Sequence, residues 1–204
     1  MRVLCACEES QAVTLALRAL GHDAFSCDIK DCSGGFPEYH IKADVLSVLY
    51  DAWDLIIAFP PCTYLSNAGN AHLHSPGRSK LRLAAIDFFY KFVNAPCEHI
   101  CIENPVGCMN TIYRKPDQII NPYDFGDSCR KRTCLWLKNL PLLAPDYSVP
   151  APDPVYIQSN GKKRYWVETC HGSDRQTLRS KTFPGIARAM AYQFTNNFYF
   201  LDTL

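Results

Sequence analysis

Short apolar runs alternate with a helical pattern at the start of the chain. Residues 3–6 predict a buried strand, and positions 13, 16, 17 and 20 have the spacing of one helix face. Ser10 is placed to cap this helix and Gly21 to end it. A second strand is expected over residues 24–27, followed by Asp28. This strand–helix–strand–acid order is typical of a doubly wound nucleotide-binding fold.

The apolar run 55–58 predicts another strand, which must end where Pro60 and Pro61 fix φ and remove two hydrogen-bond donors. Further elements are expected as a short strand at 41–45, a helix over 81–93, strands over 100–102 and 133–137, and a last helix over 184–194. Positions 81, 85, 88, 89 and 92 should form the buried face of the middle helix. The pattern predicts an α/β, doubly wound Rossmann-like fold in a single domain over residues 1–204.

One segment lacks this regularity. Five prolines lie between positions 141 and 154, and residues 144–178 are interpreted as an irregular insertion. Within it, residues 161–166 place basic side chains beside aromatic ones, which suits phosphate contacts and base stacking. A solvated hairpin is the alternative interpretation of the same residues.

Composition and charge limit the classes of protein. The 204 residues are 48% hydrophobic, enough for one sizeable core. With a net charge of +1, the protein as a whole does not attract DNA electrostatically, although a local basic patch would be enough to bind it. The N-terminus has no signal-length apolar region and no run is long enough to cross a bilayer, so a cytoplasmic protein without a membrane partner is expected.

The chain has eleven cysteines, an odd number, and several fall inside the apolar runs. Most are therefore expected to be reduced and buried as small hydrophobic residues. Their close pairs lack the two-residue spacing typical of structural zinc sites, so no metal is expected.

Three expected strands end on residues that can do chemistry: Asp28, Cys62 and Glu103. In open α/β sheets ligands bind at the carboxyl ends of the strands, where an acid after the second strand can accept hydrogen bonds from ribose hydroxyls. For Asp28 the alternative is an ordinary turn residue, and for Cys62 a structural cysteine in a turn.

Their order and surroundings resemble the cytosine-C5 DNA methyltransferase family, particularly its small phage-type and prophage-type members. Residues 58–66, with Cys62 after two prolines, resemble the proline–cysteine catalytic motif, and residues 103–105 resemble the Glu-Asn-Val motif. Residues 124–126 with 130–133 resemble the Gln-x-Arg-x-Arg region, and residues 183–191 the last motif. The family's glycine-rich first loop is replaced by residues 6–11, and its target-recognition domain is absent.

The resemblance implies a fold, a cofactor and a set of site residues. The fold would be that of S-adenosylmethionine-dependent methyltransferases, with S-adenosyl-L-methionine as the cofactor. Cys62 would be the nucleophile and Glu103 the acid that stabilises the covalent adduct. The other implied site residues are Glu8, Asp28, Asp44 and Pro60 for the cofactor, and Pro61, Asn104, Lys131 and Thr133 for the substrate. Lys131 could equally be a surface lysine.

Three hypotheses about function remain open. The first is C5 methylation of cytosine in DNA, by a homodimer or with a partner that supplies sequence recognition. The second is the same chemistry on a free pyrimidine nucleotide, which needs no recognition domain. The third is a catalytically silent protein of the same fold that binds a nucleotide or a partner.

Overall fold

A computed structural model describes residues 1–72, 74–165 and 181–196. At its centre is a seven-stranded sheet in the order β3-β2-β1-β4-β5-β7-β6. The first five strands are mutually parallel, and β7 runs antiparallel to both of its neighbours. The strands are β1 Arg2–Ala6, β2 Asp23–Asp28, β3 His40–Lys42, β4 Leu55–Ala58, β5 Ile100–Pro105, β6 Gln118–Ile120 and β7 Thr133–Lys138. The predicted α/β fold with a central sheet is confirmed.

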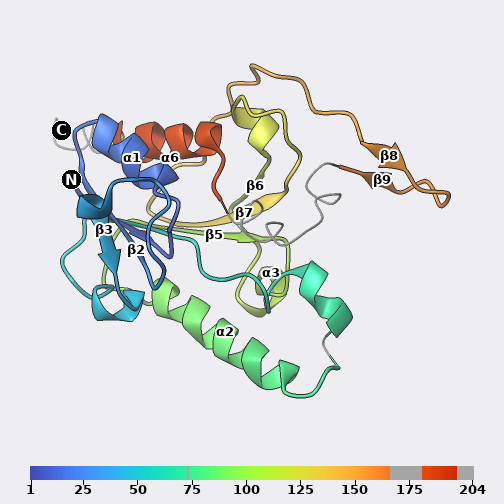
Figure 1. Cartoon of the computed structure of the whole chain (residues 1–204), viewed down its shortest axis with the longest axis horizontal. Helices are drawn as coiled ribbons and strands as arrows, with labels where there is room; N and C mark the ends of the chain where they lie inside the picture. The colour runs from blue at the N-terminus through green and yellow to red at the C-terminus, as the bar shows by residue number, and fades with distance from the viewer. Residues whose placement is uncertain (73, 166–180, 197–204) are drawn as a thin grey trace.

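Helices cover both faces of the sheet (Figure 1). On one face α1 (Ala12–Ala19) and α6 (Pro184–Asn196) pack side by side over β1 and β4. On the other lie α2 (Arg78–Val93) and the short α3 (Met109–Ile112). Short 3-10 helices occupy several connections: η1 Pro37–Tyr39, η2 Val45–Ser47, η3 Asn67–His72 and η4 Pro122–Phe125. Since both faces are covered, the central strands read as unbroken apolar runs.

The strand side chains alternate between two cores. Leu4 and Ile56 point into the core beneath α2, where they meet Phe89, Phe92 and Trp136. Their neighbours along the strands, Val3, Cys5, Leu55 and Ile57, point into the core beneath α1 and α6. In the part of the chain that the structure describes, no helix combines the length and apolar character needed to cross a membrane.

Two local expectations were wrong, and one strand was missed. Helix α2 begins at Arg78, and Leu81, expected in the core, is 47% exposed because the first half of α2 extends beyond the sheet (Figure 1). Strand β6, for which no element was expected, is three residues long and pairs with β7. Ser10 is not the main cap of α1: its Oγ lies 3.5 Å from the Ala12 nitrogen, whereas Glu8 accepts two helix N–H groups.

The irregular insertion contains a small hairpin. Strands β8 (Tyr156–Ile157) and β9 (Lys163–Arg164) pair antiparallel, and the turn between them uses Gly161 at φ 80°. A hairpin is therefore present in this segment, and it is compatible with both interpretations of residues 161–166. Residues 166–178 of the expected insertion lie outside the described residues.

The order in which strands are added to the sheet reverses between the parallel neighbours β1 and β4. From β1 the chain passes through α1 to β2 on one side, and from β4 through α2 to β5 on the other. In doubly wound sheets the crevice outside the carboxyl ends of such neighbouring strands is where ligands bind. The carboxyl ends of β1 and β4, residues 6 and 58, therefore mark the place to look for a site.

Candidate active site

Cys62 lies just beyond the carboxyl end of β4. The Phe59 N–H still donates to the Ala6 carbonyl (2.9 Å), and the two prolines then end the ladder. The Cys62 carbonyl accepts from the N–H groups of Leu65 (3.0 Å) and Ser66 (2.9 Å), which closes a tight turn. Of the ten described cysteines, all outside disulfides, seven are buried, two are half-buried and Cys62 is exposed. Cys62 is thus the described thiol that a large substrate can best reach.

Asn104 ties this turn to the next strand. Its side chain is buried, and Nδ2 donates to the Pro60 carbonyl oxygen at 2.7 Å. Two main-chain bonds continue the connection, from Asn67 to Val106 (3.1 Å) and from Cys108 to Leu65 (2.8 Å). The Asn104 Oδ1 is buried and has no hydrogen-bond partner among the described residues. An unpaired buried oxygen costs free energy. The bond from Nδ2 of the same side chain fixes the turn against β5.

Glu103, next to Asn104, shares its surroundings with Lys131 and Thr133. Burial raises the pKa of Glu103 above its ordinary value, while Lys131 and a hydrogen bond with Thr133 partly oppose the shift. The antiparallel register explains this grouping, because it places Thr133 of β7 opposite Pro105 of β5. The structure therefore brings together three predicted site residues around a carboxyl group that takes up a proton more readily than usual.

Asp28 and Asp44 both lie near the end of β1. Burial raises the pKa of Cys7, and these two carboxylates raise it further, which shows that both are close to its thiol. Asp28 accepts from the Lys30 N–H, and Asp44 caps η2 through the Leu46 N–H, each at 3.0 Å. Two carboxylates at one sheet edge suit the hydroxyl and amine groups of a nucleoside.

Glu8 points into the protein instead. Its carboxylate is buried and accepts from the Val13 N–H (2.7 Å), the Thr14 N–H (3.2 Å) and the Thr14 hydroxyl (2.7 Å). Burial raises the pKa of Glu8 to about 7, although these hydrogen bonds oppose the shift. The carboxylate thus satisfies the amino end of α1 and is not directed toward the crevice.

A contact between two loops was missed in the sequence. The buried Gln11, at φ 58°, donates from Nε2 to the Phe36 carbonyl (2.7 Å) and accepts from the Phe36 N–H (3.2 Å). The Ser33 N–H donates to the Glu9 carbonyl (2.8 Å). A Cβ on Gly34 would lie 2.6 Å from Gln11 Cβ, so glycine is required for this approach. The Gly34–Gly35 pair signalled a loop, but nothing in the pattern indicated its neighbour.

Apart from Glu8, the predicted site residues therefore form three groups along one sheet edge. In the first, Asn104 binds Pro60 directly, and the exposed Pro61 and Cys62 follow Pro60 in the chain. Glu103, Lys131 and Thr133 form the second group, which is linked to the first through the backbone of β5. Asp28 and Asp44 form the third. In the described residues no cluster of three His, Cys, Asp or Glu side chains could hold a metal ion.

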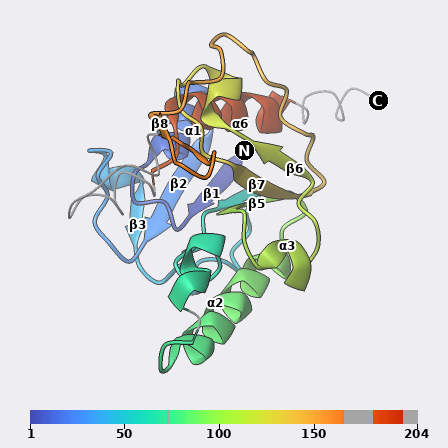
Figure 2. The ribbon, with the colours of Figure 1, turned by 90° about the vertical axis from the view of Figure 1, so that its right-hand side faces the viewer.

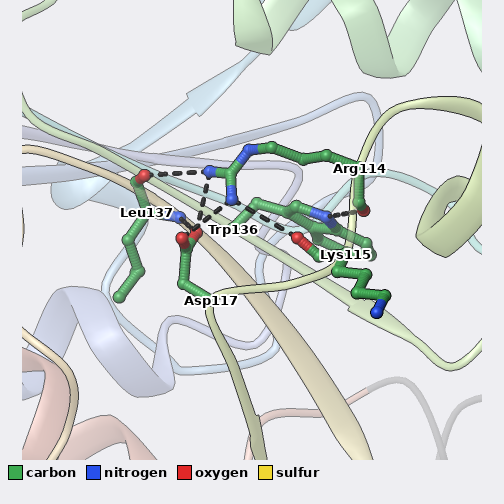
Figure 3. A network of polar contacts seen from close by, with 5 residues as sticks. All are labelled: Arg114, Lys115, Asp117, Trp136 and Leu137. Atoms are coloured by element: carbon green, nitrogen blue, oxygen red, sulfur yellow. Dashed lines mark hydrogen bonds and ion pairs between the residues drawn. The ribbon is translucent and has the colours of Figure 1, made fainter.

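A separate polar network lies at the opposite edge (Figure 3). The Arg114 guanidinium pairs with Asp117 at 2.7 Å and donates to the Leu137 carbonyl (3.1 Å), while Trp136 Nε1 donates to the Arg114 carbonyl (2.9 Å). Burial alone would raise the pKa of Asp117, but the hydrogen bonds from Arg114 and the Leu137 N–H outweigh it and hold the pKa below its ordinary value. These side chains border a cavity of about 300 Å³. The network anchors the loop before β6 and is structural.

Comparison with known proteins does not identify a family for this chain, so its function is argued from its residues. The chain matches no model of a known protein family, and the search of curated proteins found no match.

Proposed function

We propose that this chain is an S-adenosylmethionine-dependent methyltransferase that methylates C5 of cytosine in DNA through a covalent adduct with Cys62. One observation carries the proposal. The exposed Cys62 follows two prolines at the carboxyl end of β4, where the strand order of the sheet reverses. Asn104 ties this segment to β5, the strand that carries Glu103. A nucleophile and a proton-binding carboxyl group are thereby fixed at one sheet edge.

The chemistry assigns Cys62 the first step. Cytosine C5 is a poor nucleophile, so the Cys62 thiolate adds to C6 and the electron pair of the C5–C6 double bond makes C5 nucleophilic. S-adenosylmethionine, when bound, supplies the methyl group as an electrophilic sulfonium. After methylation, a base removes the C5 proton, the C6–S bond breaks, and the thiolate leaves.

Glu103 is proposed to hold the proton that stabilises the adduct. Addition at C6 shifts electron density to N3, and a protonated carboxyl group beside N3 offsets this charge. The raised pKa of Glu103 supports the role, since at a given pH this carboxyl group holds a proton more readily than an ordinary glutamate does. Lys131, close to Glu103, is suited to the base carbonyl or a phosphate.

For the cofactor, Asp28 and Asp44 fit the nucleoside half, because the charges of both carboxylates act on Cys7 just after β1. Glu8 does not fit the methionine half, because its carboxylate is engaged at the amino end of α1. The carbonyl of Pro60 is engaged by Asn104, so we assign Pro60 to fixing the turn. A catalytically silent nucleotide-binding protein is the second candidate, favoured by the replacement of a glycine-rich first loop by residues 6–11, in which Gln11 is engaged by Phe36.

The decisive experiment is transfer of a labelled methyl group from S-adenosylmethionine to duplex DNA, single-stranded DNA and dCMP. Cys62→Ser should abolish transfer. The matched control is Cys97→Ser, because Cys97 is buried at the far edge and a hydroxyl can keep its bond to the Trp53 carbonyl. Transfer that survives Cys62→Ser would exclude the covalent mechanism. Absence of both transfer and cofactor binding would leave the silent protein as the better description.

A mechanism-based trap gives an independent test. DNA containing 5-fluorocytosine has no C5 proton to lose, so the adduct should persist and be found at Cys62 by peptide mass mapping. An adduct on any other cysteine would contradict the assignment.

A further inference from the structure

The β8–β9 hairpin lies away from both cores of the protein (Figure 1). Its described residues 155–164 contribute no side chain to either core, and Val155, Tyr156 and Ile157 are each at least half exposed. A two-stranded hairpin by itself is at best marginally stable in water. An exposed hairpin with apolar side chains therefore suggests a surface that meets a partner.

Charge on this hairpin is of one sign. Residues 154–165 hold Lys162, Lys163 and Arg164 and no acidic residue. Residues 128–133, with Arg130, Lys131 and Arg132, likewise hold no acid. Because the whole chain carries only +1, the remainder is net negative, and these two segments form a local positive surface. We call the five residues Arg130, Arg132, Lys162, Lys163 and Arg164 the basic surface.

The two segments are joined in space. Arg130 Nη1 donates to the Tyr165 hydroxyl at 2.9 Å, and its guanidinium lies 4.7 Å from the centre of the Tyr165 ring. Lys131, the next residue, lies close to Glu103 of the candidate active site. The basic surface thus borders the site. Figure 2 looks onto the side of the molecule from which the hairpin projects.

The pairing of the hairpin sorts its side chains by face. Tyr156 pairs with Arg164, and Ile157 pairs with Lys163, so each face carries one large apolar or aromatic side chain beside one basic side chain. Aromatic and basic side chains in alternation suit bases and phosphates respectively. A two-stranded ribbon also has the dimensions that the major groove of duplex DNA admits.

We infer that the basic surface binds the phosphate backbone of the nucleic-acid strand beside the candidate active site. The choice of nucleic acid among polyanions rests on the proposed function. The basic side chains hold the backbone in a sequence-independent way, and the exposed aromatic and apolar side chains of the ribbon contact the bases. The hairpin thereby supplies part of the contact that a recognition domain would otherwise provide.

The test is fluorescence anisotropy with a labelled cytosine-containing duplex and its separate single strand, titrated at several salt concentrations. Lys162→Ala/Lys163→Ala should reduce affinity by roughly eightfold per lost phosphate contact, or roughly 60-fold in all, at about 0.1 M salt, and lower the salt slope by about two. Lys162→Arg/Lys163→Arg should restore binding. The matched control is Lys91→Ala/Lys115→Ala, which removes the same charge from α2 and the loop before β6.

Each outcome decides the inference separately from the proposed function. Binding that falls only in the hairpin alanine variant supports it, even if the wild-type protein transfers no methyl group. Equal losses in both double variants would mean non-specific attraction and overturn it. Methyl transfer to dCMP without binding to either oligonucleotide would also overturn it, while leaving the proposed chemistry intact. The difference in affinity of the wild-type protein for the duplex and for the single strand identifies which form of DNA it binds.

Discussion

Replacement of Glu8 by glutamine should stabilise the protein above neutral pH and destabilise it slightly in acid. Glu8 is buried at the amino end of α1, and its pKa is raised from 4.5 to about 7. Glutamine can still accept from the Val13 N–H and donate to the Thr14 hydroxyl, but its amide nitrogen cannot accept from the Thr14 N–H. The variant is therefore uncharged at every pH and lacks one bond to the amino end of α1.

The size of the effect follows from linkage. Between pH 4.5 and about 7 the folded protein binds more protons at Glu8 than the unfolded chain does, so its stability falls as pH rises through this window. The contribution is fully present below the unfolded pKa and is lost above the folded one. At about 1.4 kcal/mol per pKa unit, the shift corresponds to roughly 3 kcal/mol. For a chain of this length that is roughly 6–12 °C in Tm.

Urea denaturation, followed by the fluorescence of the buried Trp53 and Trp136, measures the difference. The free energy of unfolding should be lower for Glu8→Gln by about 1 kcal/mol at acidic pH, because the bond from the Thr14 N–H is lost, and higher for Glu8→Gln at alkaline pH. Taking the difference between them cancels the titrating groups that do not interact with Glu8. Cys5 is not one of these, because burial raises its pKa well above the ordinary value and the charge of Glu8 raises it further. A difference that does not change with pH would refute this account of Glu8, as would a less stable variant at alkaline pH.

Three further substitutions test the packing around the site and at the far edge. Gly34→Ala should cost about 1–3 kcal/mol in thermal unfolding, because the new Cβ would lie 2.6 Å from Gln11 Cβ; an unchanged Tm would contradict the close approach. Asp117→Asn should cost only about 1 kcal/mol, since its ion pair with Arg114 is about a third exposed, and urea midpoints should show it. Asn104→Ala should lower kcat for methyl transfer far more than it lowers Tm, because it frees the proline turn while removing an unsatisfied oxygen; equal effects on both would indicate a purely structural residue.

The sheet could be predicted because its strands are apolar on both faces. Strands β1, β2, β4, β5 and β7 were each expected within a few residues of their observed bounds. Strand ends were also informative, since the two prolines after β4 can only end a ladder. The nearness of Thr133 to Glu103 depends on an antiparallel pairing across 27 intervening residues, which no local pattern reveals.

The direction of the Glu8 side chain could not be predicted. The run Glu8-Glu9-Ser10 offers three oxygen-bearing side chains that could cap α1, and the local pattern does not choose among them. The choice follows from the backbone, because Cys7 and Gln11 both have positive φ and turn Glu8 inward. For a non-glycine residue that conformation is uncommon, so tertiary contacts set it. The nucleophilic role of Cys62 stays a prediction.

Because β7 pairs antiparallel with β5, the pKa of Glu103 depends on the register between these two strands. Glu103 pairs with Leu135, and Pro105 pairs with Thr133. A slip of one residue would turn every side chain of β7 to the other face of the sheet and move the threonine away from the acid. Insertions in the long connection between β5 and β7 should consequently be tolerated wherever they preserve this registry. During evolution, the proton affinity of Glu103 would then be preserved as long as the β5–β7 pairing is preserved, even where the surrounding loops change in sequence and length.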